Sequence, residues 1–85
     1  MARTTRKNVE GIFSVLAKMM GKQIGCEPGN WQLDYQPDYG GYVICETLST
    51  GGETKPLGHS RRTAGDMWDT MHFAIRLLEY RDEKR

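Results

Sequence analysis

Two stretches of the chain carry apolar residues at the three- and four-residue spacing of an amphipathic helix. In the first stretch, residues 5–21, the apolar positions fall within about 120° of a helical wheel and form one stripe. These positions are Val9, Ile12, Phe13, Leu16, Met19 and Met20. Thr4 and Thr5 are candidate N-caps for this helix, and Gly21 can end it in a left-handed conformation.

The second helical pattern begins at Thr63 and runs to about Tyr80. Thr63 and Asp66 have the spacing of a capping box, which satisfies backbone N–H groups of the first helical turn. The residues of its main apolar stripe are Met67, Met71, Ala74, Ile75 and Leu78. The flanking residues predicted to widen this stripe are Trp68, Phe73 and Leu77.

Between the two helices the pattern changes to the alternation that is typical of β-strands. Residues 31–35 alternate apolar and polar side chains, which predicts a half-buried strand. Residues 37–41 have the turn chemistry of a hairpin, and the second strand is predicted over Tyr42–Leu48. A short third strand follows over Glu53–Leu57, and Pro56 places it at an edge because proline has no N–H to donate.

The order of these elements, α-β-β-β-α, predicts a single α+β domain over residues 1–85. The simplest arrangement is a three-stranded antiparallel meander with two helices packed on one face. The second strand is apolar on both sides, with Tyr42, Ile44 and Leu48 on one side and Val43 and Cys45 on the other. One of these sets therefore faces outward. The outer sheet face is either a contact surface or an ordinary surface with scattered apolar residues.

Length and composition limit the class of protein. A chain of 85 residues with 38% hydrophobic content builds one small domain. We expect no membrane protein, because no window approaches the roughly 18 apolar residues of a membrane span. No secretory signal precedes Cys26 and Cys45, so we expect free thiols and a reducing cytoplasm. These cysteines lack metal-ligand spacing with His59 and His72, and we expect neither a metal nor a cofactor.

The net charge of +1 conceals an uneven distribution along the chain. Residues 1–25 carry five basic residues and one acidic residue, whereas residues 26–50 carry four acidic residues and no lysine or arginine. The acidic stretch also holds the aromatic residues around the first hairpin. An acidic, aromatic surface suits a basic protein partner better than a nucleic-acid backbone. The candidate protein-contact residues are Asp34, Asp38, Tyr39, Tyr42 and Ile44.

The segment before the second helix concentrates groups that can hold an anion. The candidate phosphate- or carboxylate-binding residues are Lys55, His59, Ser60, Arg61, Arg62 and Thr63. Guanidinium groups, hydroxyls and the N–H groups of a helix start are all suited to this role. The alternative is a solvated basic turn with an ordinary N-cap, paired with nearby acids such as Asp66 or Glu53.

The element order, together with the G-x-S-R-R-x-A segment, resembles the double-stranded-RNA-binding domain. The residues that match the family pattern in type and order are Ser60, Arg61, Arg62 and Ala64. The resemblance implies phosphate contacts by Arg61 and Arg62, with Lys55 nearby. The chain departs from the family where Gly65 stands in place of a basic residue and where the first hairpin loop carries Asp38.

Residues 31–80 also resemble small accessory proteins of tailed phages that infect actinobacteria. The residues that carry this resemblance are Trp31, Leu33, Asp34, Tyr35, Tyr39, Gly40, Gly41, Tyr42, Gly58, Arg61, Arg62, Ala64, Met67 and Trp68. The resemblance implies a phage protein in the host cytoplasm that binds a host or phage component. It implies no particular target.

The residues predict no catalytic machinery. Ser60 and His59 are adjacent, and adjacent side chains seldom take the orientation that proton transfer needs. Our first hypothesis is a non-enzymatic module that binds a host or phage protein. The alternative is a nucleic-acid binder that uses the anion-binding candidates together with basic residues of the first helix, which are Lys7, Lys18 and Lys22. A homodimer formed through the outer sheet face or the third-strand edge is a further hypothesis.

Overall fold

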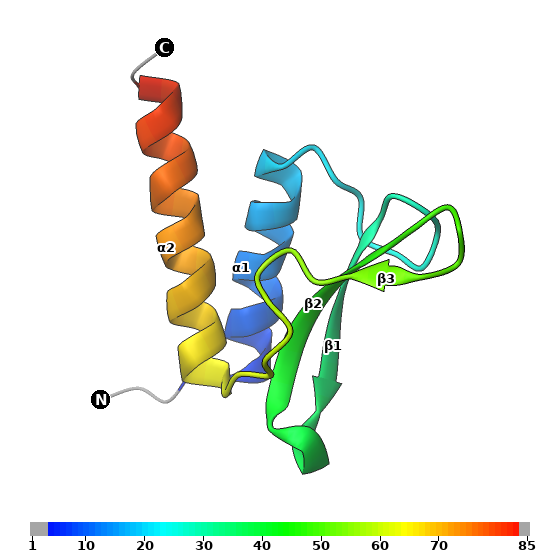
Figure 1. The fold of residues 1–85 in the computed structure, drawn as a ribbon. Coiled ribbons are helices and arrows are strands. Elements are labelled where there is room, and N and C mark those ends of the chain that lie inside the picture. Colours follow the sequence, from blue (N-terminus) through cyan, green and yellow to red (C-terminus); the bar gives the residue numbers. More distant parts are fainter. Residues whose placement is uncertain (1–3, 84–85) are drawn as a thin grey trace.

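The computed structural model describes residues 4–83. Two helices lie side by side and run in the same direction, with the sheet to one side of them (Figure 1). Helix α1 spans Arg6–Met19 and helix α2 spans Ala64–Glu83. Thr5 caps α1: its hydroxyl accepts the Asn8 N–H, and the Asn8 side chain accepts the Thr5 N–H at 2.9 Å. Gly21 follows with φ +71°, the left-handed conformation predicted for the end of this helix.

The strands form one antiparallel sheet in the order β1-β2-β3. Strand β1 spans Trp31–Gln36, the 3-10 turn η1 spans Pro37–Tyr39, β2 spans Gly41–Thr47 and β3 spans Glu53–Thr54. The prediction for the third strand was too long. Pro56 has no N–H for the ladder, and the Gly58 N–H donates to the Lys55 carbonyl at 2.9 Å in a turn. Strand β3 therefore ends after two residues.

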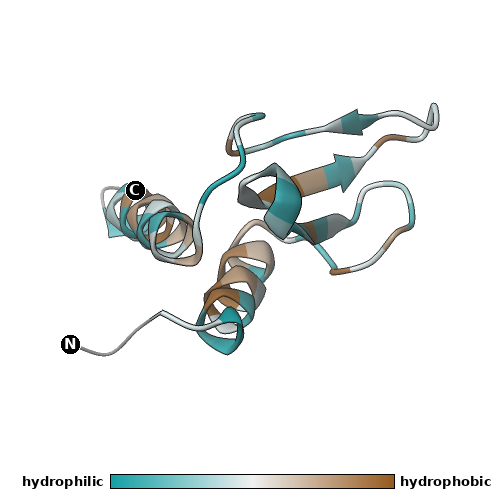
Figure 2. Cartoon of the chain, turned by 90° about the horizontal axis from the view of Figure 1, so that it is seen from below, coloured by the Kyte–Doolittle hydropathy of each residue, from teal (hydrophilic) through white to brown (hydrophobic). Residues whose placement is uncertain are grey.

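Both helices pack on the same side of the sheet, as Figure 2 shows in a view along the helices. The core therefore takes side chains from α1, β1, β2 and α2. Its buried residues are Val9, Phe13, Leu16, Ala17, Trp31, Tyr42, Ile44, Met67 and Met71. This arrangement confirms the predicted α+β domain. Neither helix in the described part of the chain is long and apolar enough to cross a membrane.

The outer face of the sheet is covered at Val43 and Cys45, so these residues form neither an apolar contact surface nor scattered exposed residues. Val43 and Cys45 point away from the helices, yet they are only 3% and 4% exposed. The cover is the segment between β3 and α2. Arg62 pairs with Tyr42 on the edge of β2, and the Arg61 side chain reaches Asp34 on β1, directly opposite Val43.

Helix α2 buries a narrower stripe than its sequence suggests. Met67 and Met71 are fully buried, whereas Phe73 and Leu77 are 66% and 54% exposed. At 100° per residue, both lie roughly 100–140° from the buried line of the helix, beyond the reach of α1 and β2. The prediction that these two residues widen the core stripe was wrong. The helix also continues to Glu83, past its predicted end near Tyr80.

Candidate functional site

Arg61, the centre of the predicted anion site, is engaged inside the protein. Its guanidinium donates to the Gly41 carbonyl at 2.9 Å, to the Asp34 carbonyl at 3.5 Å and to the Asp34 carboxylate. Only 22% of the side chain is exposed. An arginine with three internal acceptors fastens the segment before α2 to the hairpin, and few of its donors remain for an external anion.

The other two cations of this segment are also paired. Arg62 exchanges two backbone hydrogen bonds of 2.8 Å with Tyr42, and its guanidinium lies 3.5 Å from the Leu57 carbonyl. The Lys55 ammonium lies 3.2 Å from the Glu53 carboxylate, and this hydrogen bond raises the pKa of Lys55. Burial raises the pKa of the Cys45 thiol, and the nearby Lys55 charge opposes that shift.

The remaining candidates of the segment, His59, Ser60 and Thr63, are exposed. Thr63 is the N-cap of α2, and its hydroxyl accepts the Asp66 N–H at 3.2 Å. His59 and Ser60 are exposed in the loop before Arg61. Among the basic residues of the first helical region, Lys22 lies past the end of α1 and pairs with Glu46 at 3.5 Å. Most residues of the predicted anion site therefore make their polar contacts within the protein.

The five predicted protein-contact residues divide into two groups. Tyr42 and Ile44 are 3% and 1% exposed and belong to the core, so their prediction as surface contacts was wrong. Asp34 is paired with Arg61. Asp38 and Tyr39 are exposed in η1, and Tyr39 is the most exposed of the large hydrophobic residues at 75%. The contact surface available at the hairpin is therefore its tip, η1.

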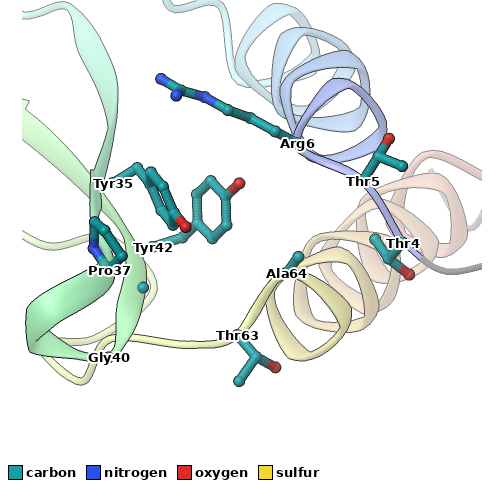
Figure 3. Close-up of a pocket in the computed structure, with 10 residues that line it drawn as sticks. Thr4, Thr5, Arg6, Tyr35, Pro37, Gly40, Tyr42, Thr63 and Ala64 are labelled. Carbon is teal, nitrogen blue, oxygen red and sulfur yellow. The ribbon is translucent and has the colours of Figure 1, made fainter.

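An open cavity of about 690 Å³ lies beside this tip (Figure 3). The hairpin forms one side of the cavity, and the first residues of α1 and of α2 form the other. Residues that line it include Thr5, Arg6, Tyr35, Pro37, Tyr42 and Ala64. The sequence did not point to Thr5, Arg6, Pro37 or Ala64 as site residues. The capping signals before both helices were visible, but only the parallel arrangement of the helices brings these two starts together.

Two stacked tyrosines form the hairpin side of the cavity. The rings of Tyr35 and Tyr42 are 4.5 Å apart and nearly parallel, at 29°. The Arg6 guanidinium lies 5.3 Å from the Tyr35 ring and 3.8 Å from the Glu10 carboxylate. Burial raises the pKa of Tyr42, with a smaller contribution from Tyr35, so its hydroxyl remains a neutral donor at physiological pH.

Residues 4–83 contain no group of three histidine, cysteine or acidic side chains placed to hold a metal ion. Cys26 and Cys45 are both free thiols, as predicted, with Cys26 exposed and Cys45 buried. In comparisons with protein-family models, curated proteins and solved structures, nothing matches this chain.

Proposed function

We propose that this protein is a non-enzymatic binding module that acts on another protein, with its contact surface at the hairpin end. The observation that carries the proposal is Tyr39, which is 75% exposed beside the open cavity. The 3-10 turn η1 holds it, and Gly40 closes that turn with φ +102°. Tyrosine is enriched among the residues that dominate binding energy in protein interfaces, because it combines a large ring with a polar tip.

The charges near the hairpin end favour a protein over a nucleic acid as the partner. Asp38 lies next to Tyr39 and would repel a phosphate backbone. The cations that a phosphate backbone would need, Arg61 and Lys55, are paired with Asp34 and Glu53. Binding of duplex RNA or DNA through the segment before α2 is the alternative that the experiment must separate from protein binding.

The resemblance of residues 31–80 to accessory proteins of phages that infect actinobacteria suggests where to search for the partner. On this proposal, the protein works in the cytoplasm of an infected cell and binds a host or phage component. A partner that contributes an apolar or basic side chain to the tip would complement Tyr39 and Asp38.

The test is affinity capture with the full chain from actinobacterial lysates made with and without phage infection, each with and without nuclease treatment. We expect one protein at stoichiometric yield, captured by the parent chain and lost with Tyr39→Ser. The matched control is Phe73→Ser, because Phe73 is a similarly exposed aromatic residue on α2, at 66%. Capture that disappears on nuclease treatment, or that Tyr39→Ser leaves unchanged, would contradict the proposal.

A further inference from the structure

We infer that the cavity beside the hairpin tip binds a single carboxylate group of the partner, next to an apolar side chain. This inference rests on the proposed function and names the chemistry that the site recognises. Three features carry it: two helix N-termini line the same cavity, the hydroxyl of the largely buried Tyr42 opens into it without a protein partner, and the wall around that hydroxyl is aromatic.

The first residues of α1 and of α2 both line the cavity, through Arg6 and Ala64. The helices have 14 and 20 residues and run in the same direction, so the positive ends of their dipoles lie at the same end of the molecule (Figure 1). In each helix the capping threonine accepts only one N–H, that of Asn8 or Asp66. The N–H groups of the first two helical positions have no acceptor within the helix and can bind an anion.

Tyr42 supplies the independent observation. Only 3% of the residue is exposed, and its hydroxyl makes no hydrogen bond to any other residue between Thr4 and Glu83. Figure 3 shows this hydroxyl directed into the space between the hairpin and the two helix starts. This hydroxyl opens to the solvent of the cavity, because no side-chain oxygen among residues 4–83 is both sealed from solvent and without a partner. It can therefore donate to an acceptor oxygen of a ligand without giving up a bond within the protein.

The surroundings favour a carboxylate over a phosphate. Tyr35 and Pro37 give the hairpin side of the cavity an aromatic and apolar surface that suits the side chain beside the carboxylate. The nearest cation, Arg6, is already paired with Glu10. A doubly charged phosphate would thus meet one shared cation and a nearby carboxylate, whereas a single negative charge needs only the helix N-termini and the Tyr42 hydroxyl.

The test uses NMR titration of the isotopically labelled full chain with four probes. The probes are acetate, N-acetyl-glutamate amide, N-acetyl-phenylalanine with a free carboxylate, and inorganic phosphate. We expect carboxylates to shift the amide signals of Arg6, Lys7, Ala64 and Gly65, and phosphate to bind more weakly. The second and third probes distinguish a side-chain carboxylate from a chain-terminal carboxylate as the natural source, and either result supports the inference.

The decisive variant is Tyr42→Phe, which removes one oxygen that has no partner in the described structure. We expect carboxylate affinity to fall about ten-fold, because a hydrogen bond to a charged group is lost. The midpoint of thermal unfolding should not fall. Tyr39→Phe, a hydroxyl deletion outside the cavity, is the matched control and should bind the probes as the parent chain does. A Tyr42→Phe variant with unchanged affinity, or tighter binding of phosphate than of carboxylates, would overturn the inference.

The two proposals fail in different ways. If Tyr39→Ser abolishes capture of the protein partner but no carboxylate shifts the helix-start amides, the hairpin end binds a protein without the carboxylate contact. If carboxylates shift these amide signals and Tyr42→Phe lowers the affinity for carboxylates, the carboxylate site is supported even where the capture experiment finds no protein.

Discussion

The basic segment 55–63 and the hairpin end differ in which one the sequence and the structure favour as a binding surface. The basic segment has the more obvious chemistry, with two adjacent arginines and a lysine, yet each cation finds a partner inside the molecule. The hairpin end has little positive charge. It nevertheless presents an exposed Tyr39, an open cavity and a Tyr42 hydroxyl without an acceptor among the described residues. A charged side chain is available to a ligand only where it is not already paired with a group of the protein itself.

The two regions are joined at Gly41, where the start of β2 meets the backbone of Arg62. A Cβ on Gly41 would lie against the Arg62 carbonyl oxygen, closer than any real contact allows. Gly41 also has φ +115°, a conformation that residues with a side chain rarely adopt. The close approach lets Arg62 pair with Tyr42 and brings Arg61 within reach of Asp34.

Breaking this junction should have the largest effect. We expect Gly41→Ala to lower the free energy of unfolding by about 3 kcal/mol, because strain at positive φ and a backbone clash both oppose the native state. Chemical denaturation measures the loss. Gly51→Ala is the matched control: it has φ +93° with no atom near the added methyl group, so it should lose only about 1 kcal/mol. Equal losses for the two variants would show that the close contact between residue 41 and the Arg62 backbone adds nothing to the cost of the substitution.

The next largest effect should come from the contact between Arg61 and Asp34. We expect Arg61→Ala to cost about 2 kcal/mol of stability, since three hydrogen bonds from a charged group are lost. A double-mutant cycle with Asp34→Ala should give a coupling of about 1 kcal/mol. Arg76→Ala, at an exposed arginine of α2, is the control and should change stability by less than about 0.5 kcal/mol.

The Arg61→Ala variant, tested for binding to duplex RNA as well as for stability, decides whether the basic segment serves the fold or binds nucleic acid. An Arg61→Ala variant that keeps its stability but loses binding to duplex RNA would assign Arg61 to nucleic acid instead. In that case, binding by the parent chain should weaken steeply as the salt concentration rises.

A smaller effect is expected at the opposite end of the β1–β2 pair, where Glu46 is another charge used inside the fold. The Trp31 indole N–H donates to its carboxylate at 2.6 Å, and this bond lowers the pKa of Glu46 below its ordinary value of 4.5. A lowered pKa means that the ionised form stabilises the native state above pH 4.5. That stability is lost as the pH falls through the native-state pKa.

Glu46→Gln should therefore make stability depend less on pH below about 4.5. Urea denaturation of both chains at a series of pH values between neutral and strongly acidic measures the difference. Two curves that stay parallel throughout would show that the ionised Glu46 contributes nothing specific to the native state.

The smallest effect on stability should come from the hairpin tip itself. Tyr39 is 75% exposed, so Tyr39→Ser should change the free energy of unfolding by less than about 0.5 kcal/mol. This near-neutral result is what allows the variant to test binding without disturbing the fold. A larger loss in chemical denaturation would indicate that Tyr39 packs against the domain and would move the contact surface elsewhere.

Much of the fold could be read from local patterns, and the failures share one cause. The stripe with Phe13 and Leu16 at its centre is buried as predicted, and Thr5 and Thr63 cap the two helices. Phe73 was misplaced because periodicity locates an apolar side chain on a helix but does not reveal how far the neighbouring elements extend. The outer face of the sheet was misread for the same reason, since its cover comes from a loop.

The sequence alone determined the element order, the helix caps and the hydrophobic stripes, because these depend on residues a few positions apart. The tertiary structure alone decided which polar groups remain available. Whether Arg61 meets an internal acceptor or a ligand depends on Asp34, 27 residues away along the chain. Likewise, the two helix starts and the Tyr42 hydroxyl face one cavity only because the helices run parallel beside the hairpin. Such contacts arise from long-range packing, and no local pattern encodes them.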